Sequence, residues 1–261
     1  MIDTHCHFDF PPFSDDPAYW VSRSVDAGLT SIIVPSVTAD RWPSVQSLST
    51  SHSPLYFAVG LHPVWSSSHQ EGDIAALEAF LATSPEKCVA VGECGLDFMI
   101  DDANPQAQID ILKQQLTLAE TFQLPVILHC RKAHNELLQV LNGFPNVKGV
   151  LHAFSGSKEM GLNYIKRGFL LGIGGTITYE RANKTRNAIA ELPLSAMVLE
   201  TDAPDMPVSG YQGEPNLPER LLLIAEALSG LKGSNVGEVI QATSQNARRL
   251  FSLNSEISSF A

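Results

Sequence analysis

The sequence predicts an α/β protein with the architecture of a (β/α)8 TIM barrel. Short apolar runs alternate with amphipathic stretches along the 261 residues, as strands and helices do in α/β proteins. The runs are almost continuously apolar, which is typical of parallel strands that helices cover on their outer face. The alternation recurs eight times, and eight such units in about 250 residues are the usual size of this barrel. A doubly wound open sheet is the alternative that the same alternation allows.

Eight apolar runs are predicted to be the strands. Each is short, is rich in Val, Ile or Leu, and is followed by polar or turn-forming residues. They are Met1–His5, Ser31–Pro35, Leu55–Gly60, Cys88–Glu93, Pro125–His129, Gly149–His152, Gly168–Ile173 and Ala196–Thr201.

The stretches between these runs have helical patterns and helix-end signals. Apolar residues share one helical face from 104 to 123. Ser157 is typical of an N-cap, and Gly168 of the position just after a helix. Pro218 can open a further helix, and the last helix begins near Val236.

Composition favours one soluble enzyme-sized domain without disulfides. Residues 1–253 contain no linker and are predicted to be one domain, with 254–261 as a C-terminal tail. The four cysteines have no CxxC spacing, no apolar run reaches the roughly 18 residues of a membrane span, and the start lacks a signal-peptide pattern. We therefore expect a cytoplasmic monomer without membrane contact. The net charge of −11 argues against a large non-specific nucleic-acid surface.

Metal-binding side chains stand at the ends of most predicted strands. In a barrel these ends converge on one face, where catalytic residues gather. His5 and His7 are two apart and can face one ion together, whereas Cys6 between them points away. The whole set at the strand ends is His5, His7, His62, Glu93, His129, His152 and Asp202.

This set indicates two divalent cations bound side by side. Even without His62, its four imidazoles and two carboxylates exceed what one tetrahedral site needs, and a carboxylate can bridge two ions about 3.5–4 Å apart. The mixed nitrogen and oxygen donors suit Zn, Mn, Ni or Fe better than Mg, although Mg stays among the candidates.

Ordered motifs at these positions resemble those of the TatD family of metal-dependent deoxyribonucleases, particularly its YjjV-type members, within the amidohydrolase-like barrels. The resemblance spans nearly the whole chain. Its only departures are Cys94 and Cys130, which are not ligand positions. The motifs are IDTHCHFD at 2–9, GLHP at 60–63, VGECGLD at 91–97, PVILH at 125–129, HAFSG at 152–156, GIGGTITY at 172–179 and LETDAP at 199–204, with a terminal-helix match at 246–251.

The resemblance implies a fold of the metal-dependent hydrolase type and a division of ligands between two metals. One metal would be held by His5, His7, Glu93 and Asp202, and the other by Glu93, His129 and His152. We expect Asp202 both to bind metal and to accept the proton of the attacking water.

Further residues have two possible roles each. His62 is assigned to the substrate phosphate or leaving group, with a structural hydrogen bond as the alternative. Arg131, two residues past His129, is the expected cation for the phosphate, or else a solvated loop residue. Asp3 and Glu200 are candidates for orienting the histidines, or for a buried ion pair with Arg or Lys.

Three more features lie close to the predicted ligands. The cysteines beside them are expected to be small buried thiols that do not bind metal. The Gly172–Gly175 segment is either a phosphate cradle or a plain tight turn, and Asp205 is a candidate for the pocket rim.

The charge distribution supports a substrate with phosphates. Residues 131–186 contain nine Lys or Arg and three Asp or Glu, whereas residues 1–100 contain three and twelve. A DNA backbone would lie along the positive segment. The predicted function is therefore hydrolysis of DNA phosphodiester bonds. A hydrolase of a small amide, lactone or phosphoester is the alternative, and a non-catalytic barrel is disfavoured by the complete ligand set.

Overall fold

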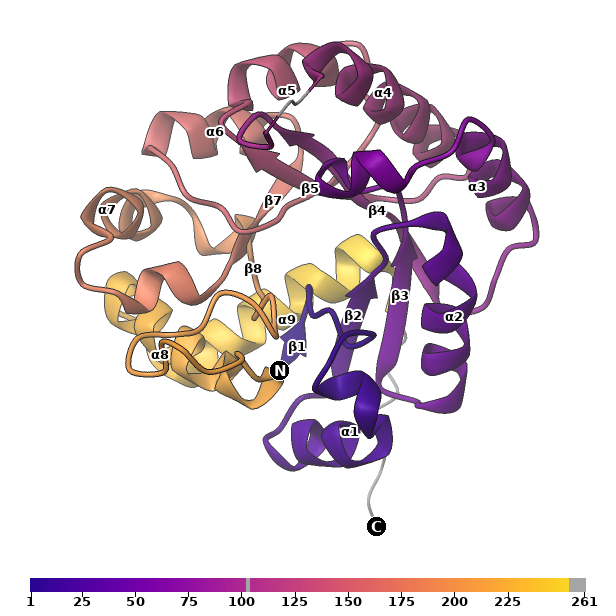
Figure 1. Cartoon of the computed structure of the whole chain (residues 1–261). Coiled ribbons are helices and arrows are strands. Elements are labelled where there is room, and N and C mark those ends of the chain that lie inside the picture. Colours follow the sequence, from indigo (N-terminus) through magenta and orange to yellow (C-terminus); the bar gives the residue numbers. More distant parts are fainter. Residues whose placement is uncertain (102–103, 254–261) are drawn as a thin grey trace.

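Eight parallel strands form one sheet in which spatial neighbours follow the order of the chain (Figure 1). This computed structural model describes residues 1–101 and 104–253, so the predicted tail at 254–261 lies outside the described residues. The strands are β1 Ile2–Asp3, β2 Ser31–Pro35, β3 Leu55–Val59, β4 Cys88–Asp97, β5 Val126–Arg131, β6 Gly149–Leu151, β7 Phe169–Ile173 and β8 Met197–Leu199.

Backbone hydrogen bonds between the ends of β1 and β8 close the sheet into a barrel. Thr4 N–H donates to Leu199 O at 3.0 Å, and Asp202 N–H donates to His5 O at 2.8 Å. Cys6 and Ala203 form a parallel bridge just beyond. The (β/α)8 prediction is confirmed and the open-sheet alternative is wrong, because an open sheet would leave these two edges unpaired.

All helices except the last surround the sheet as an outer layer, whereas the last one crosses one end of the barrel (Figure 1). The N-caps at Asn104 and Ser157 accept hydrogen bonds from backbone N–H groups three residues on. Pro218 opens a short 3-10 turn that leads into α8. The helices are α1 Pro17–Asp26, α2 Trp42–Ser51, α3 Asp73–Ala82, α4 Pro105–Thr121, α5 His134–Leu141, α6 Lys158–Lys166, α7 Asn183–Glu191, α8 Leu221–Lys232 and α9 Val236–Phe251.

Two apolar clusters stabilise this arrangement. The larger one lies between the strands and the helices, where Leu112 and Leu116 of α4 are fully buried. The smaller one joins strand residues such as Ile33 and Ile127 to Ala247 and Phe251 of α9. The last helix therefore covers the barrel interior on the side opposite the strand ends that carry the polar residues. No helix of the described ranges is both long and apolar enough to cross a membrane.

The observed β4 is longer than predicted. We expected it to end at Glu93, but pairing with β5 continues to Asp97 after a register shift between Val91 and Cys94. Gly95 permits this continuation, because a Cβ there would lie 2.0 Å from the His129 carbonyl oxygen of β5. The extension brings Asp97 to the polar end of the barrel.

Candidate metal centre

A pocket of about 470 Å³ opens at the carboxyl ends of the strands. Its floor is polar, and one wall is apolar. All six predicted metal ligands except His5 line it, and His5 is fully buried directly beneath. The lining residues are His7, Phe10, Pro11, Val37, His62, Val64, Trp65, Glu93, His129, His152, Asp202, Pro204 and Asp205.

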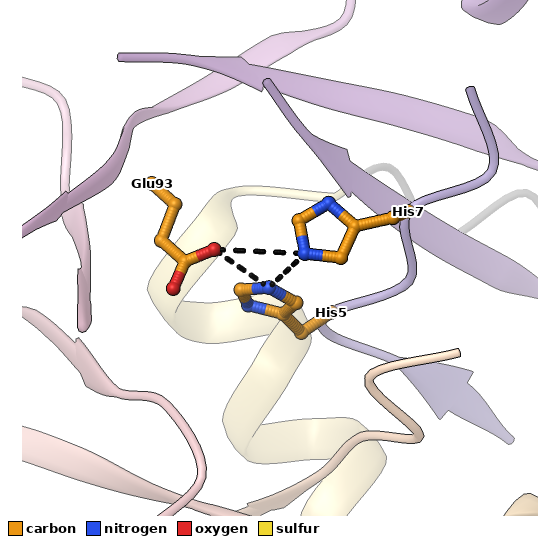
Figure 2. A group of neighbouring side chains, drawn as sticks. All are labelled: His5, His7 and Glu93. Atoms are coloured by element: carbon orange, nitrogen blue, oxygen red, sulfur yellow. Dashed lines mark hydrogen bonds and ion pairs between the residues drawn. The ribbon is translucent and has the colours of Figure 1, made fainter. Parts of the chain in front are cut away.

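The Glu93 carboxylate lies at the centre of the floor, and its two oxygens face different groups of histidines. Oε2 is 3.1 Å from His5 Nε2 and 3.7 Å from His7 Nε2 (Figure 2). Oε1 is 3.1 Å from His62 Nε2 and 3.1 Å from His129 Nδ1. One carboxylate with a nitrogen group at each oxygen is the arrangement that a bridging ligand requires.

The first group has the dimensions of a tetrahedral metal site. His5 Nε2 lies 3.3 Å from His7 Nε2 and 3.1 Å from Glu93 Oε2. Asp202 Oδ1 lies 3.5 Å from His5 Nε2 and 3.6 Å from His7 Nε2. A cation with bonds of about 2.0–2.1 Å separates tetrahedral ligands by about 3.4 Å. Five separations among these donors are 3.1 to 3.7 Å, on both sides of this value. His5, His7 and Glu93 therefore form a group that can hold one ion, with Asp202 next to both of its histidines.

Asp202 reaches the floor from an unusual backbone conformation. Its φ of +58° is in the left-handed region, which Asp and Asn tolerate better than most residues. Its second oxygen, Oδ2, lies 3.7 Å from His152 Nε2. The Asp202 carboxylate therefore also faces both histidine groups.

His129 is held between two carboxylates. Its Nε2 lies 3.0 Å from Asp97 Oδ2, and its Nδ1 lies 3.1 Å from Glu93 Oε1. Asp97 is buried and is clamped by Gln108 of α4, which exchanges two hydrogen bonds with the Asp97 backbone. When Nε2–H donates to Asp97, the bare Nδ1 faces a carboxylate oxygen, so a cation or a proton must lie between them. Asp97 is thus a positioning residue that the sequence reasoning missed.

Glu200 supports His152 in a similar way. Glu200 Oε1 lies 3.0 Å from His152 Nδ1 and accepts a hydrogen bond from Ala153 N–H at 2.5 Å. Both side chains are buried, and no Lys or Arg of the described chain pairs with Glu200. Gly172 makes room for it, because a Cβ there would lie 2.2 Å from Glu200 Oε2. Of the two roles considered for Glu200, the structure shows contact with a histidine.

Asp3 takes neither of the roles that we predicted for it. Its carboxylate accepts hydrogen bonds from the backbone N–H of His5 and from the N–H and hydroxyl of Thr201. It therefore ties the end of β1 to the segment after β8, instead of touching an imidazole or a basic residue. Burial raises the pKa of Asp3 to about 7, although these hydrogen bonds act in the opposite direction and lower it.

The tautomer of His62 follows from its contacts. Val64 N–H donates to His62 Nδ1 at 3.1 Å, so in the neutral ring the proton is on Nε2, which donates to Glu93 Oε1. Burial lowers the pKa of His62 and favours this neutral form. The structural hydrogen bond that we considered is present, and the same N–H lines the pocket.

The remaining predicted residues lie around this floor. Arg131 ends β5 and is exposed, outside the pocket lining. Asp205 lines the pocket, and burial and the charge of Asp202 raise its pKa. The buried Cys94 thiol points to the Ile127 carbonyl, away from the floor. Burial raises the pKa of Cys94 and of Cys130, so both are inert thiols.

Protons and cations compete for this cluster. Burial alone would raise the pKa of Glu93, but the charges of neighbouring histidines hold it well below its usual range. Burial lowers the pKa of His129, yet its bonds to Asp97 and Glu93 raise it to about 9. His152 is likewise raised to about 10, chiefly by Glu200 and Asp202. The cluster thus demands positive charge, which divalent cations supply in place of protons.

The metal-free protein is expected to lose stability as pH rises from about 6.5 to about 10. In the unfolded chain both histidines release their protons near pH 6.5, whereas the folded chain keeps them up to pKa values of about 9 and 10. The stabilisation is complete below pH 6.5 and is lost as pH passes the folded values. Thermal unfolding of chelator-treated protein across this range measures it. If the stability of the wild type does not change with pH, these two histidines are not the cause. The same holds if stability depends on pH equally strongly in the His129→Asn/His152→Asn double variant.

Asp97→Asn is expected to weaken metal binding by about 10- to 100-fold, because the ring of His129 loses a charged partner that orients it and raises its basicity. Metal titration and kcat/KM measure the effect. Asp110→Asn, on the outer surface of α4, is the matched control. Equal affinities for the wild type and Asp97→Asn would show that Asp97 has no role in the site.

Comparisons with known proteins agree with this geometry. The sequence model described as TatD related DNase matches residues 2–252. The chain belongs to this family. The TatD-family relatives include the uncharacterized metal-dependent hydrolase YjjV of Escherichia coli K12, which is 44% identical over 97% of this chain and 98% of its own. The crystal structure of YjjV superimposes with a TM-score of 0.94 over the same shares of the two chains.

A second TatD-family relative has a name that states a reaction. It is the 3'-5' ssDNA/RNA exonuclease TatD of Erwinia tasmaniensis, 33% identical over 97% of this chain and 100% of its own. Family membership, together with the cluster of metal-binding side chains, makes this protein a metal-dependent hydrolase.

Proposed function

We propose that the protein is a deoxyribonuclease that hydrolyses DNA phosphodiester bonds with two divalent cations. The observation that supports this proposal is the position of the Glu93 carboxylate, whose two oxygens contact different histidines. When bound, the cations would neutralise a phosphate and lower the pKa of a water. One would be held by His5, His7, Glu93 and Asp202, and the other by Glu93, His129 and His152.

Asp202 is proposed to accept the proton of the attacking water. Its side chain is 12% exposed and lines the pocket, whereas that of Glu93 is 2% exposed and surrounded by imidazoles. Of the two carboxylates, Asp202 is therefore the one that can pass a proton on to solvent.

His62 and Arg131 are proposed to bind the substrate. The Nε2–H of His62 lies in the pocket, beside Glu93, and can donate to a phosphate or leaving-group oxygen. Arg131 is exposed at the end of β5 and begins the segment 131–186, in which basic residues outnumber acidic ones nine to three. This segment is the proposed path of the nucleic-acid backbone.

The pocket volume is compatible with two functions. A cavity of about 470 Å³ holds one small molecule or one nucleotide, and not a duplex. This agrees with cleavage at the end of a single strand, which is the action in the name of the Erwinia relative. It agrees equally with hydrolysis of a small amide, lactone or phosphoester.

Labelled single- and double-stranded oligonucleotides separate the two functions. Protein loaded with Zn, Mn, Ni or Mg is expected to shorten the single strand, with capture that weakens steeply as salt rises. No strand cleavage with any of these metals, together with hydrolysis of small esters, would overturn the nuclease proposal in favour of the alternative.

A further inference from the structure

One wall of the pocket is apolar, although it stands beside a strongly charged floor. This wall consists of Phe10 and Pro11, from the loop after β1, and of Val64 and Trp65, from the 3-10 helix η3 Pro63–Ser68 after β3. Val64 is 47% exposed and Trp65 is 39% exposed. Other exposed large apolar side chains of the described chain, such as Tyr19, do not line this pocket. Apolar surface exposed next to a catalytic floor indicates a contact with substrate.

The rings of Phe10 and Trp65 are neighbours, but a cation packs against Phe10, whereas Trp65 is more exposed. The two ring centroids lie 6.3 Å apart, at an interplanar angle of 41°. The Arg41 guanidinium lies 3.8 Å from the Phe10 centroid and is itself held by Asp9 at 2.7 Å. Phe10 is thus backed and fixed by a cation, while Trp65 keeps much of its ring exposed toward the pocket.

Trp65 is also fixed relative to the floor. Its backbone N–H donates to the His62 carbonyl at 3.0 Å, and the backbone N–H of Val64 donates to His62 Nδ1. The same short turn therefore sets the position of His62, which contacts Glu93, and of Trp65. Trp65 is therefore held in a fixed position beside the metal-binding residues of the same pocket.

We propose that Trp65, with Phe10 beside it, is a stacking platform for an unpaired base whose own phosphodiester lies at the metal centre. This inference rests on the proposed nuclease function and assigns the side chains that would bind the terminal base. A planar base matches an exposed indole ring, and Trp65 lines the same pocket as the metal-binding residues, where the phosphate of that base would lie. A base inside a duplex is already paired and stacked, so it cannot occupy this wall.

A stacking platform should bind any of the four bases about equally well, but it should bind poorly a strand end that lacks a base. Stacking on an aromatic ring strengthens binding by roughly 5- to 150-fold per base and requires only a π-face. Phe10, Pro11 and Val64 have no hydrogen-bonding group in their side chains, so the indole N–H of Trp65 is the side-chain donor of this wall, and it is too little to distinguish the four base edges. All four bases should therefore be accepted, and a terminal abasic nucleotide should be captured poorly.

The test compares single strands that differ only in whether their terminal two nucleotides carry bases. Trp65→Ala is expected to raise KM about tenfold for the base-bearing strand and to leave KM for the abasic strand unchanged. Trp65→Phe should restore most of the capture, and Tyr19→Ala, an exposed aromatic outside the pocket, should behave as wild type. Equal losses on both strands, or no loss on either, would overturn the platform.

A binding measurement separates this inference from the nuclease function itself. Deoxyadenosine monophosphate is expected to quench tryptophan fluorescence of Zn-loaded wild type, and deoxyribose 5-phosphate is not. The quenching should disappear in Trp65→Phe, which keeps Trp20 and Trp42. Absence of quenching in the wild type overturns the platform even if strands are cleaved. Quenching without cleavage of any strand overturns the nuclease proposal and leaves base stacking established.

Discussion

Glu93→Gln is expected to lower kcat/KM by at least about 10³-fold and to remove bound metal. Both oxygens of Glu93 face imidazole nitrogens, so an amide in its place supplies a weak oxygen ligand to one group and an N–H₂ to the other. Loss of one bridging charge therefore damages both cation positions together. Metal content by elemental analysis and kcat/KM on a single-stranded oligonucleotide measure the two effects.

Gln has nearly the size of Glu, so Glu93→Gln is expected to remain folded, which far-ultraviolet circular dichroism checks. Glu78→Gln, on the exposed face of α3, is the matched control for the substitution itself. A Glu93→Gln protein that keeps two ions and at least a tenth of the activity would exclude a bridging role.

Asp202→Asn is expected to lower kcat by about 10²- to 10⁴-fold, with a much smaller change in KM. Asn keeps a ligand oxygen and tolerates the positive φ at this position, but it cannot accept a proton. The variant should therefore retain metal more completely than Glu93→Gln while losing turnover. Single-turnover cleavage, with metal content measured on the same sample, tests this.

Two outcomes would contradict the role of Asp202. Full turnover at full metal content would mean that another group accepts the proton. Loss of all metal would mean that Asp202 acts chiefly as a ligand, because turnover would then fall for want of cations.

The strand ends were predictable from sequence because a physical rule links them to the site. Apolar runs locate the parallel strands, and in a barrel the residues after each run must meet on one face. The family motifs then divided the residues between two metals. The structure brings the six expected ligands together at one polar floor. The predicted strand ends are nevertheless off by one or two residues at β1, β3, β5, β6 and β8, and by four residues at β4.

Asp97 was missed because the predicted strand stopped at Glu93. Two glycines in Val91–Asp97 look like a turn, whereas Gly95 in fact permits close approach to β5. A signal was available in the alternation of the strand. Glu93 and Asp97 are four apart and share a face, with His129 opposite Gly95 between them.

Other assignments depended on distances that no local pattern contains. The tautomer of His62 follows from a backbone N–H two residues later, after the chain has turned into η3. Gly172 was interpreted as part of a phosphate cradle or a turn, yet its lack of a side chain makes room for Glu200 from the neighbouring strand. Contacts between residues far apart in the chain decide such roles, and register must be known before they can be derived.

Anomalous diffraction from metal-loaded crystals directly tests whether Glu93 bridges two cations. We expect two peaks about 3.5–4 Å apart, one against Glu93 Oε1 and the other against Glu93 Oε2. The first peak should also contact His129 and the second His5 and His7. A single peak at full metal loading, or two peaks that Glu93 does not bridge, would contradict it.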